Sequence, residues 1–309
     1  IFELPAGKVQ FRASVNDIDG SVYSESADGA STQLDNDFET YRAGLVLPIF
    51  ADLQRDEPVL GNLSLTVEAG RSRSNRGRAN SLFSSSANWQ FRPWLNISAT
   101  FSQDSEAIDG TLLDTATTVT TGVTVFDPLL NRTALVTQFS GGNPGLLPQK
   151  RETTGFSVSL APYAPGNVQV GISYTDSRLR DSIGFLPPAS IELLAAFPER
   201  FIRDVTGQLT SIDTRPVNFD RQERRDLRAS VSFMIPLLGR TAAASSGGAR
   251  LQISASYGLA LEDRFVLRQG LAPVDLLAGG ATGFGGGRPE QSGELTATLS
   301  RKGSGFSMQ

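Results

Sequence analysis

Apolar and polar residues alternate along most of this chain, which is typical of strands that have one apolar face and one polar face. In the stretch 155–160, Phe156, Val158 and Leu160 alternate with glycine and serine. The same period of two occurs in the ranges 9–15, 39–47, 62–69, 83–91, 95–102, 168–175, 227–235, 251–259 and 295–299, with a truncated example at 303–309. The pattern predicts an all-β, antiparallel architecture of about ten or eleven strands.

The composition of the polar rows indicates which environment the polar face of each strand meets. The rows contain mainly serine, threonine, asparagine, glutamine and glycine, and charged residues make up only 19% of the chain. Small uncharged side chains suit a wall that faces a confined, polar lumen, with the apolar rows facing lipid. Strands built around these segments would have the length of about 9–11 residues that a tilted transmembrane strand needs. We therefore expect an up-and-down transmembrane β-barrel.

The connections between these segments alternate between long and short, as in a barrel that has long loops on one rim and tight turns on the other. Pro93-Trp94 forms a short one, whereas the connections before and after residues 155–175 are long. We expect one short helix in the long loops, at Ile191–Phe197 with Ser190 as its N-cap. Hydrocarbon does not tolerate an open sheet edge, so a chain that ends within a strand is interpreted as part of a larger barrel.

Two missing residue types limit the chemistry of the chain. It has no cysteine and no histidine, which excludes disulfides, Ser-His-Asp and Cys-His nucleophiles and imidazole metal sites. The net charge of −4 gives no basic surface for nucleic acid. We therefore expect no enzyme activity, no cofactor, no bound metal and no nucleic-acid partner.

Several segments resemble TonB-dependent outer-membrane receptors. GGNPGLLPQK, residues 141–150, is similar to a Gly-Asn-Pro stretch that enters a barrel strand from the extracellular side in that family, although Gln149 stands where glutamate is usual. RPWLNISATFSQD (92–104), FDPLLN (126–131) and FPERFIRDVTGQLTSID (197–213) resemble further parts of the barrel, in the family's order. The resemblance extends over nearly the whole chain.

The resemblance implies that residues 1–309 form part of a receptor barrel of about 22 strands, without its plug domain and its C-terminal strands. It implies the bacterial outer membrane as the location, and TonB-energised uptake of a scarce nutrient such as a siderophore or another bulky ligand. This chain would supply barrel wall and extracellular loops. Its partners would be a small-molecule ligand, TonB through the plug, outer-membrane lipid and lipopolysaccharide.

Two groups of charged residues are candidate site residues. The first, in or beside the second long loop, would hold an anionic ligand through guanidinium groups: Arg178, Arg180, Arg200, Arg203 and Arg221. These arginines have an alternative role in ion pairs with nearby aspartates or with lipopolysaccharide phosphates. The second group is expected to face the lumen, because a basic residue on the lipid face costs about 2–4 kcal/mol at mid-depth: Arg42, Glu68, Arg224 and Arg228.

Three other interpretations remain open. A passive porin or another non-enzymatic barrel would share the strand pattern but would have no plug. A barrel hydrolase would have to work with carboxylates, because the chain has no histidine to act as a base. A soluble sandwich would pack its apolar faces against a second sheet, so an outward-facing Phe156 with an inward-facing Ser157 would argue against it.

Overall fold

The structure is a computed structural model that describes residues 3–4, 7–25, 31–52, 59–74, 80–106, 108–162, 168–186, 188–236, 250–279, 287–301 and 304–308. It contains 70% strand and 6% helix, which confirms the all-β class. None of the helices in this part of the chain is long and apolar enough to cross a membrane.

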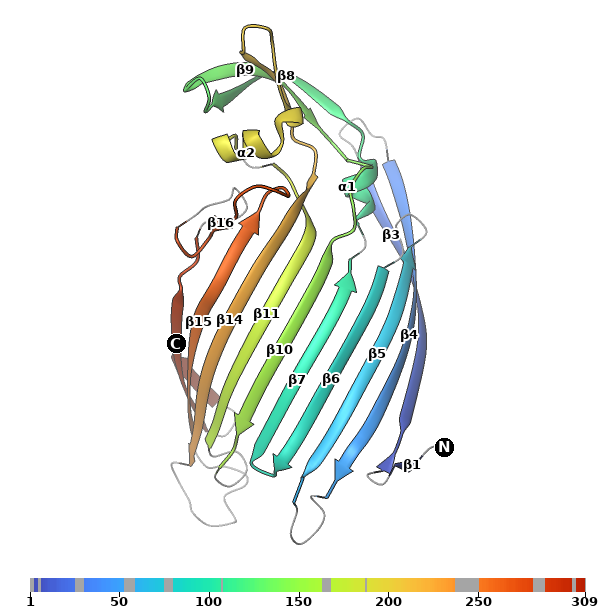
Figure 1. Ribbon diagram of the computed structural model, residues 1–309, viewed down its shortest axis with the longest axis vertical. Helices are drawn as coiled ribbons and strands as arrows, with labels where there is room; N and C mark the ends of the chain where they lie inside the picture. Colours follow the sequence, from blue (N-terminus) through green and yellow to red (C-terminus); the bar gives the residue numbers. More distant parts are fainter. Residues whose placement is uncertain are drawn as a thin grey trace.

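The strands of the main sheet pair antiparallel with their neighbours in sequence order and build one curved wall (Figure 1). In order along the wall they are β3 (Gln10–Glu25), β4 (Ser31–Ala51), β5 (Asn62–Ser74), β6 (Asn80–Arg92), β7 (Leu95–Ser105), β10 (Lys150–Leu160), β11 (Val168–Gly184), β14 (Val217–Pro236), β15 (Arg250–Val266), β17 (Gln291–Arg301) and β18 (Ser304–Met308). Within the described residues β3 and β18 are the edges of the path, so the wall is open. This is the incomplete up-and-down arrangement that the alternation predicts.

Two smaller pairings involve short strands. A short strand, β16 (Val274–Asp275), pairs with β15, and β1 (Glu3–Leu4) forms a separate hairpin with β2 (Gly7–Lys8). The turn between β6 and β7 contains only Pro93-Trp94, as expected. The tight turn that the sequence predicts at Lys302-Gly303 lies outside the described residues.

The two long connections, expected to be loops with one helix, instead fold together into a small unit at one end of the wall (Figure 1). We call this unit the cap. Its elements are α1 (Gly110–Asp114), β8 (Thr118–Asp127), β9 (Arg132–Ser140), α2 (Ile191–Ala196), η1 (Pro198–Arg200), β12 (Phe201–Arg203) and β13 (Leu209–Asp213). The strands form a four-stranded sheet in which β9 pairs antiparallel with β8 and parallel with β13.

Helix α2 begins where the sequence predicts. The Oγ of Ser190 accepts a hydrogen bond from the backbone N of Leu193 at 3.2 Å. Leu193, Leu194 and Ala196 are buried, whereas Ile191 is exposed. Because a helix of six residues is too short to be stable alone, the burial of this apolar side must hold it in place.

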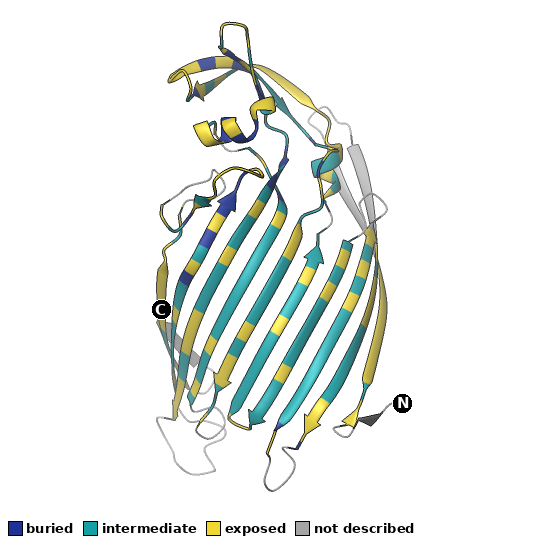
Figure 2. Ribbon diagram, in the orientation of Figure 1, coloured by how far each residue is buried: buried dark blue, intermediate teal, exposed yellow. Residues whose placement is uncertain are grey.

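The cap has its own hydrophobic core, which continues onto the adjacent ends of β14 and β15 (Figure 2). The ring of Phe219 lies at its centre, 5.6 Å from the ring of Phe197 and 5.3 Å from that of Phe265. Around them lie Ala134, Val136, Leu193, Leu194, Leu209, Ile212, Val217 and Leu276. The core therefore joins both long connections to the wall.

Several wall strands are longer than the expected membrane-spanning length. β14 contains 20 residues and β15 contains 17. The extra residues have a structural reason: the first residues of β14, including Val217 and Phe219, and the last of β15, including Phe265, enter the core of the cap. The strands therefore continue out of the wall to support the cap.

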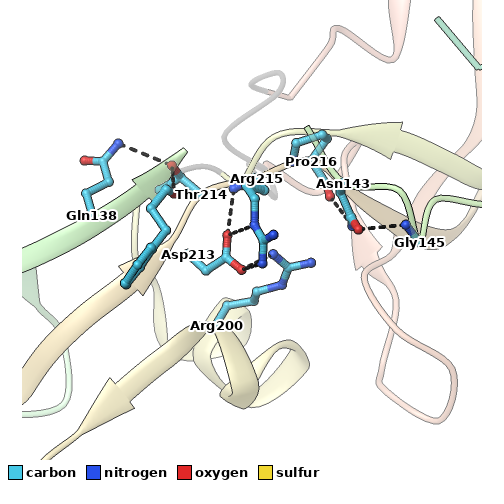
Figure 3. A network of polar contacts seen from close by, with 9 residues as sticks. Gln138, Asn143, Gly145, Arg200, Asp213, Thr214, Arg215 and Pro216 are labelled. Atoms are coloured by element: carbon cyan, nitrogen blue, oxygen red, sulfur yellow. Dashed lines mark hydrogen bonds and ion pairs between the residues drawn. The ribbon is translucent and has the colours of Figure 1, made fainter. Parts of the chain in front are cut away.

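The Gly-Asn-Pro segment before β10 is fixed by contacts with two other parts of the chain. The backbone N of Gly142 donates to the carbonyl oxygen of Thr115 at 2.8 Å. The Nδ2 of Asn143 donates to the carbonyl oxygen of Pro216 at 2.8 Å, and its Oδ1 accepts from the backbone N of Gly145 at 3.0 Å (Figure 3). The segment therefore fastens the start of β10 to the end of α1 and to the start of β14.

A side chain at residue 142 is expected to loosen this attachment. A Cβ on Gly142 would lie 2.6 Å from the carbonyl oxygen of Leu113 and 2.8 Å from the backbone N of Thr115, which are backbone atoms that cannot move aside cheaply. We expect Gly142→Ala to cost about 1–3 kcal/mol through overpacking and to raise hydrogen exchange across residues 141–149. The matched control is Gly110→Ala, because its Cβ would meet nothing within 4 Å. Equal protection of the amides of residues 141–149 from hydrogen exchange in the two variants would contradict the prediction.

Candidate functional site

The strand register assigns the side chains of the wall to two faces. Phe156 on β10 pairs with Tyr174 on β11, which pairs with Leu227 on β14. Within the described residues no second sheet covers this apolar face: Phe11 is 70% exposed, Leu295 64% and Phe156 54%. Because monomeric soluble proteins rarely expose apolar surface of this extent, the arrangement argues against a soluble sandwich.

The opposite face carries small polar side chains that bond across strands. The Oγ atoms of Ser98 and Ser157 lie 2.7 Å apart, and the Oγ1 of Thr40 lies 3.0 Å from the Oγ of Ser72. Hollows open on this face, and Ser159 lines one of them. This is therefore the concave face, with Ser157 directed inward and Phe156 outward.

The concave face has two neighbouring hollows, which differ in the side chains that line them. We call the hollow nearer the cap the upper hollow and the other the lower hollow. The lower hollow, of about 340 Å³, is lined by several hydroxyl groups, including those of Ser159, Ser230 and Thr296, by one amide, Gln169, and by one carboxylate, Glu294. The upper hollow, of about 410 Å³, is charged and is lined by Arg224, Asp226, Arg228, Arg288 and Glu290. The upper hollow is therefore the stronger candidate for binding a charged ligand.

Asp263 on β15 organises the charges around the upper hollow. Its side chain is completely buried, at 0% exposure, and its Oδ2 lies 3.3 Å from the Nε of Arg224 and 3.0 Å from the Nε of Arg288. Its Oδ1 accepts a hydrogen bond from the Nε2 of Gln222 at 3.1 Å. Arg288 also reaches Asp226 with its Nη2, at 2.5 Å. The buried carboxylate thus fixes two guanidinium groups whose remaining N–H groups are available to a ligand.

The residues predicted to face the lumen all lie on the concave face. The Nη1 of Arg42 lies 4.0 Å from the Oε1 of Glu68, and both residues line a hollow of about 630 Å³ at the β3–β5 end of the wall. Arg224 and Arg228 line the upper hollow. The structure therefore places these four residues in two pairs, at different ends of the wall.

The structure does not bring the five predicted ligand-binding arginines into one site. Arg178, Arg180 and Arg221 share the outward face of β11 and β14, beyond the apolar rows. Arg200 and Arg203 lie in the cap and bind carboxylates there. These two groups are therefore separate features of the molecule.

The cap arginines form short ion pairs. The Nη1 of Arg200 lies 2.6 Å from the Oδ2 of Asp213, which Arg215 contacts at 2.7 Å (Figure 3). Arg203 donates two hydrogen bonds to Asp127, at 2.7 and 2.8 Å, and these hold the pKa of the Asp127 carboxyl below its usual range. Burial raises the pKa of Asp213, but the hydrogen bonds from Arg215 and the charge of Arg200 lower it overall. Arg200 and Arg203 therefore stabilise the cap.

Sequence analysis missed Asp263 and Arg288, the residues at the centre of the upper hollow. Arg288 follows a glycine-rich stretch, of which residues 280–286 lie outside the described part of the chain. The available signals were an acidic residue at 263 inside a strand and an arginine at 288, directly after the glycine-rich stretch. Within the described residues, no group of acidic side chains is arranged to hold a metal ion.

Comparison by sequence identifies no relative: no protein-family profile matches the chain, and no curated protein matches it. Solved structures do resemble it. They include the siderophore receptor PirA from Acinetobacter baumannii, at 8% identity and a TM-score of 0.42, covering 96% of this chain and 49% of that one. They also include a mutant of the ferric enterobactin receptor PfeA from Pseudomonas aeruginosa, at 9% identity and a TM-score of 0.48, covering 98% and 46%.

A third similar structure is the hemophore receptor HasR from Serratia marcescens, at 10% identity and a TM-score of 0.27, covering 97% of this chain and 60% of that one. This chain spans about half the length of PirA and of PfeA. These structures are TonB-dependent receptors, the class that the sequence segments resemble. All three are named as receptors.

Proposed function

We propose that this chain is part of the barrel of an outer-membrane receptor that takes up a scarce nutrient with energy from TonB. The observation that carries the proposal is the division of one curved sheet into an uncovered apolar face and a concave face lined by hydroxyl and charged groups. A wall between lipid and a polar lumen requires this division. The segments that resemble TonB-dependent receptors support this class over other barrels.

In this proposal, residues 1–309 supply wall and cap, and regions outside this sequence supply a plug domain and the remaining strands. The plug would contact TonB. The cap lies on the rim where the family's extracellular loops are expected, so it would meet the ligand first. Arg42 and Glu68 on the concave face are then placed to contact either the plug or the ligand in transit.

The proposed ligand is a bulky small molecule with anionic oxygen atoms, such as a ferric siderophore. The support is the upper hollow, where Arg224, Arg228 and Arg288 present guanidinium groups that match carboxylate and similar oxygen pairs. PirA is named a siderophore receptor and PfeA a ferric enterobactin receptor.

The function is tested by energised uptake through the complete protein. A deletion strain is expected to lose growth on one member of a panel of ferric siderophores when iron is scarce. The wild-type gene should restore growth, and inactivation of TonB should abolish it again. Uptake of small solutes that continues without TonB would overturn the proposal in favour of a passive porin.

The role of the upper hollow is tested by Arg228→Gln. Within the described residues Arg228 lines the hollow without a carboxylate in ion-pair contact, so its charge is available to a ligand. Loss of one charge-assisted hydrogen bond is expected to weaken binding about tenfold or more. The matched control is Arg71→Gln, which removes an arginine from the outward face and should leave binding unchanged. Equal binding by both variants would exclude Arg228 from the site.

A further inference from the structure

Four of the charged side chains around the upper hollow neutralise one another. Arg288 contacts two carboxylates: its Nε lies 3.0 Å from the Oδ2 of Asp263, and its Nη2 lies 2.5 Å from the Oδ1 of Asp226. The Nε of Arg224 also lies 3.3 Å from the Oδ2 of Asp263. Two guanidinium groups therefore meet two carboxylates, and this group of four carries no net charge.

Two further charged residues line the upper hollow without such a partner. Among the described residues, neither Arg228 nor Glu290 has an oppositely charged side chain within ion-pair distance, and both are exposed. Arg228 belongs to the polar row of β14, and Glu290 continues the alternation of Ser292 and Glu294, which line the two hollows. The hollow therefore presents a cation and a carboxylate that are both available to an occupant.

Arg228 and Glu290 stand on opposite sides of the upper hollow. Arg228 on β14 pairs with Gly258 on β15, which pairs with Ser292 on β17, and Glu290 lies two residues before Ser292. Two strand spacings correspond to about 10 Å across the sheet and two residues to about 7 Å along it, so the two Cα atoms lie about 12 Å apart. An occupant can therefore lie between the two charges and contact both.

A glycine keeps the space between these two charges open. Gly258 lines the upper hollow between the strand of Arg228 and the strand of Ser292. A Cβ at position 258 would lie 2.8 Å from the Oγ of Ser292. A larger side chain there would occupy the floor of the hollow, so the room for an occupant depends on the missing side chain.

We propose that the upper hollow binds the zwitterionic end of a ligand, with an anionic oxygen group at Arg228 and an ammonium group at Glu290. The inference rests on the proposed function and narrows its ligand. A guanidinium group donates to paired oxygen atoms, whereas a carboxylate only accepts hydrogen bonds and therefore needs a donor such as an ammonium group. A ligand with anionic groups alone would be repelled by Glu290, and one with cationic groups alone would be repelled by Arg228.

The test measures the binding of three peptides to the complete protein, purified in detergent, by isothermal titration calorimetry. Tetraglycine carries both end charges, up to about 13 Å apart when it is extended. N-acetyl-tetraglycine keeps only the carboxylate, and tetraglycine amide keeps only the ammonium group. We expect tetraglycine to bind at least about tenfold more tightly than either blocked peptide, because each of these loses one charge-assisted hydrogen bond.

Two outcomes of this measurement would overturn the inference. The first is that a blocked peptide binds as tightly as tetraglycine, because one of the two charges would then be irrelevant. The second is that no peptide binds, as expected if side chains from another part of the complete protein supply the same two charges and fill the hollow.

Two variants assign each residue to its partner group on the peptide. Glu290→Gln is expected to weaken tetraglycine binding about tenfold, while N-acetyl-tetraglycine binds no more weakly than to the wild type. Arg228→Gln should also weaken tetraglycine binding about tenfold, but it should leave the binding of tetraglycine amide undiminished. A merely structural role would lower the affinity for all three peptides alike. That result, or no loss for tetraglycine, contradicts the inference.

The matched control for Glu290→Gln is Glu152→Gln. It removes the same charge from the outward face of β10, where Glu152 pairs with Arg178 on β11. This variant is expected to bind tetraglycine like the wild type. If it loses as much affinity as Glu290→Gln, the effect comes from the overall charge of the protein and the hollow is not the binding site.

The inference and the proposed function can fail separately. TonB-dependent growth on a ferric siderophore, together with equal binding of the three peptides, would overturn the inference alone. Selective binding of tetraglycine, together with uptake that continues without TonB, would overturn the proposed function alone.

Discussion

Replacing Phe219 by alanine is expected to open the cap while leaving the wall intact. Phe219 is 2% exposed, and its ring contacts the rings of Phe197, next to α2, and Phe265, on β15. Truncation of a buried phenylalanine costs about 3–5 kcal/mol, because apolar contacts are lost and a cavity remains. The cost falls on the cap because this ring joins its core to the wall.

Hydrogen exchange of the purified protein measures this effect. Amides of α2 and β13 should lose protection in Phe219→Ala, whereas those of β6 and β7 should exchange as in the wild type. The matched control is Phe156→Ala, the same truncation at a side chain that is 54% exposed on the outward face. Unchanged exchange of α2 in Phe219→Ala would show that the cap does not depend on this core.

The second large effect is expected from Asp127→Asn. The Asp127 side chain is 1% exposed and holds Arg203, whose side chain is 21% exposed. Removal of one partner of a buried pair costs about 3–5 kcal/mol, since the remaining charge has lost its partner. The control is Glu199→Gln, which breaks the exposed pair with Arg268, at 52% and 51% exposure, and is expected to cost about 0–1 kcal/mol. Similar losses of cap protection in both variants would contradict the prediction.

The same pair is expected to govern the response of the cap to acid. Hydrogen bonds from Arg203 hold the folded-state pKa of Asp127 below its usual range, and the unfolded value is about 3.9. The stabilisation is therefore complete above about pH 4 and is lost as the pH falls through the lower folded-state pKa. Cap protection should be constant from about pH 7 to pH 5 in the wild type. A loss of cap protection between pH 7 and pH 5 would show that a titratable group other than Asp127 governs the response to acid.

The wall was predictable from the sequence because its signal is local. Each strand alternates in the same way, as Phe156 and Ser157 do, and lipid on one side with a polar lumen on the other enforces that alternation over its full depth. The cap was not predictable. Its strands are short, and its core combines single residues such as Val136, Leu209 and Phe219, whose burial depends on the packing of distant segments.

The candidate site was predictable only where the alternation is regular. Arg224 and Arg228 follow the polar row of β14, so their placement on the concave face could be derived. Asp263 could not be placed in this way, because Asp226 pairs with Ala260 and Arg225 with Glu262, which leaves Leu261 without a partner. This β-bulge reverses the phase of β15. If the alternation continued regularly from Ala260, the side chain of Asp263 would point outward. Because of the bulge, it points inward.

The composition of the cap core has a consequence for the order of folding. Val136, Leu193, Phe219, Phe265 and Leu276 come from segments far apart in the chain. Contacts of such long sequence separation are slow to form, because the intervening chain must first be ordered. Pairing of β11, β14 and β15 brings these segments together. The cap is therefore expected to assemble last, and an inserted wall with an open cap to be the final intermediate of biogenesis.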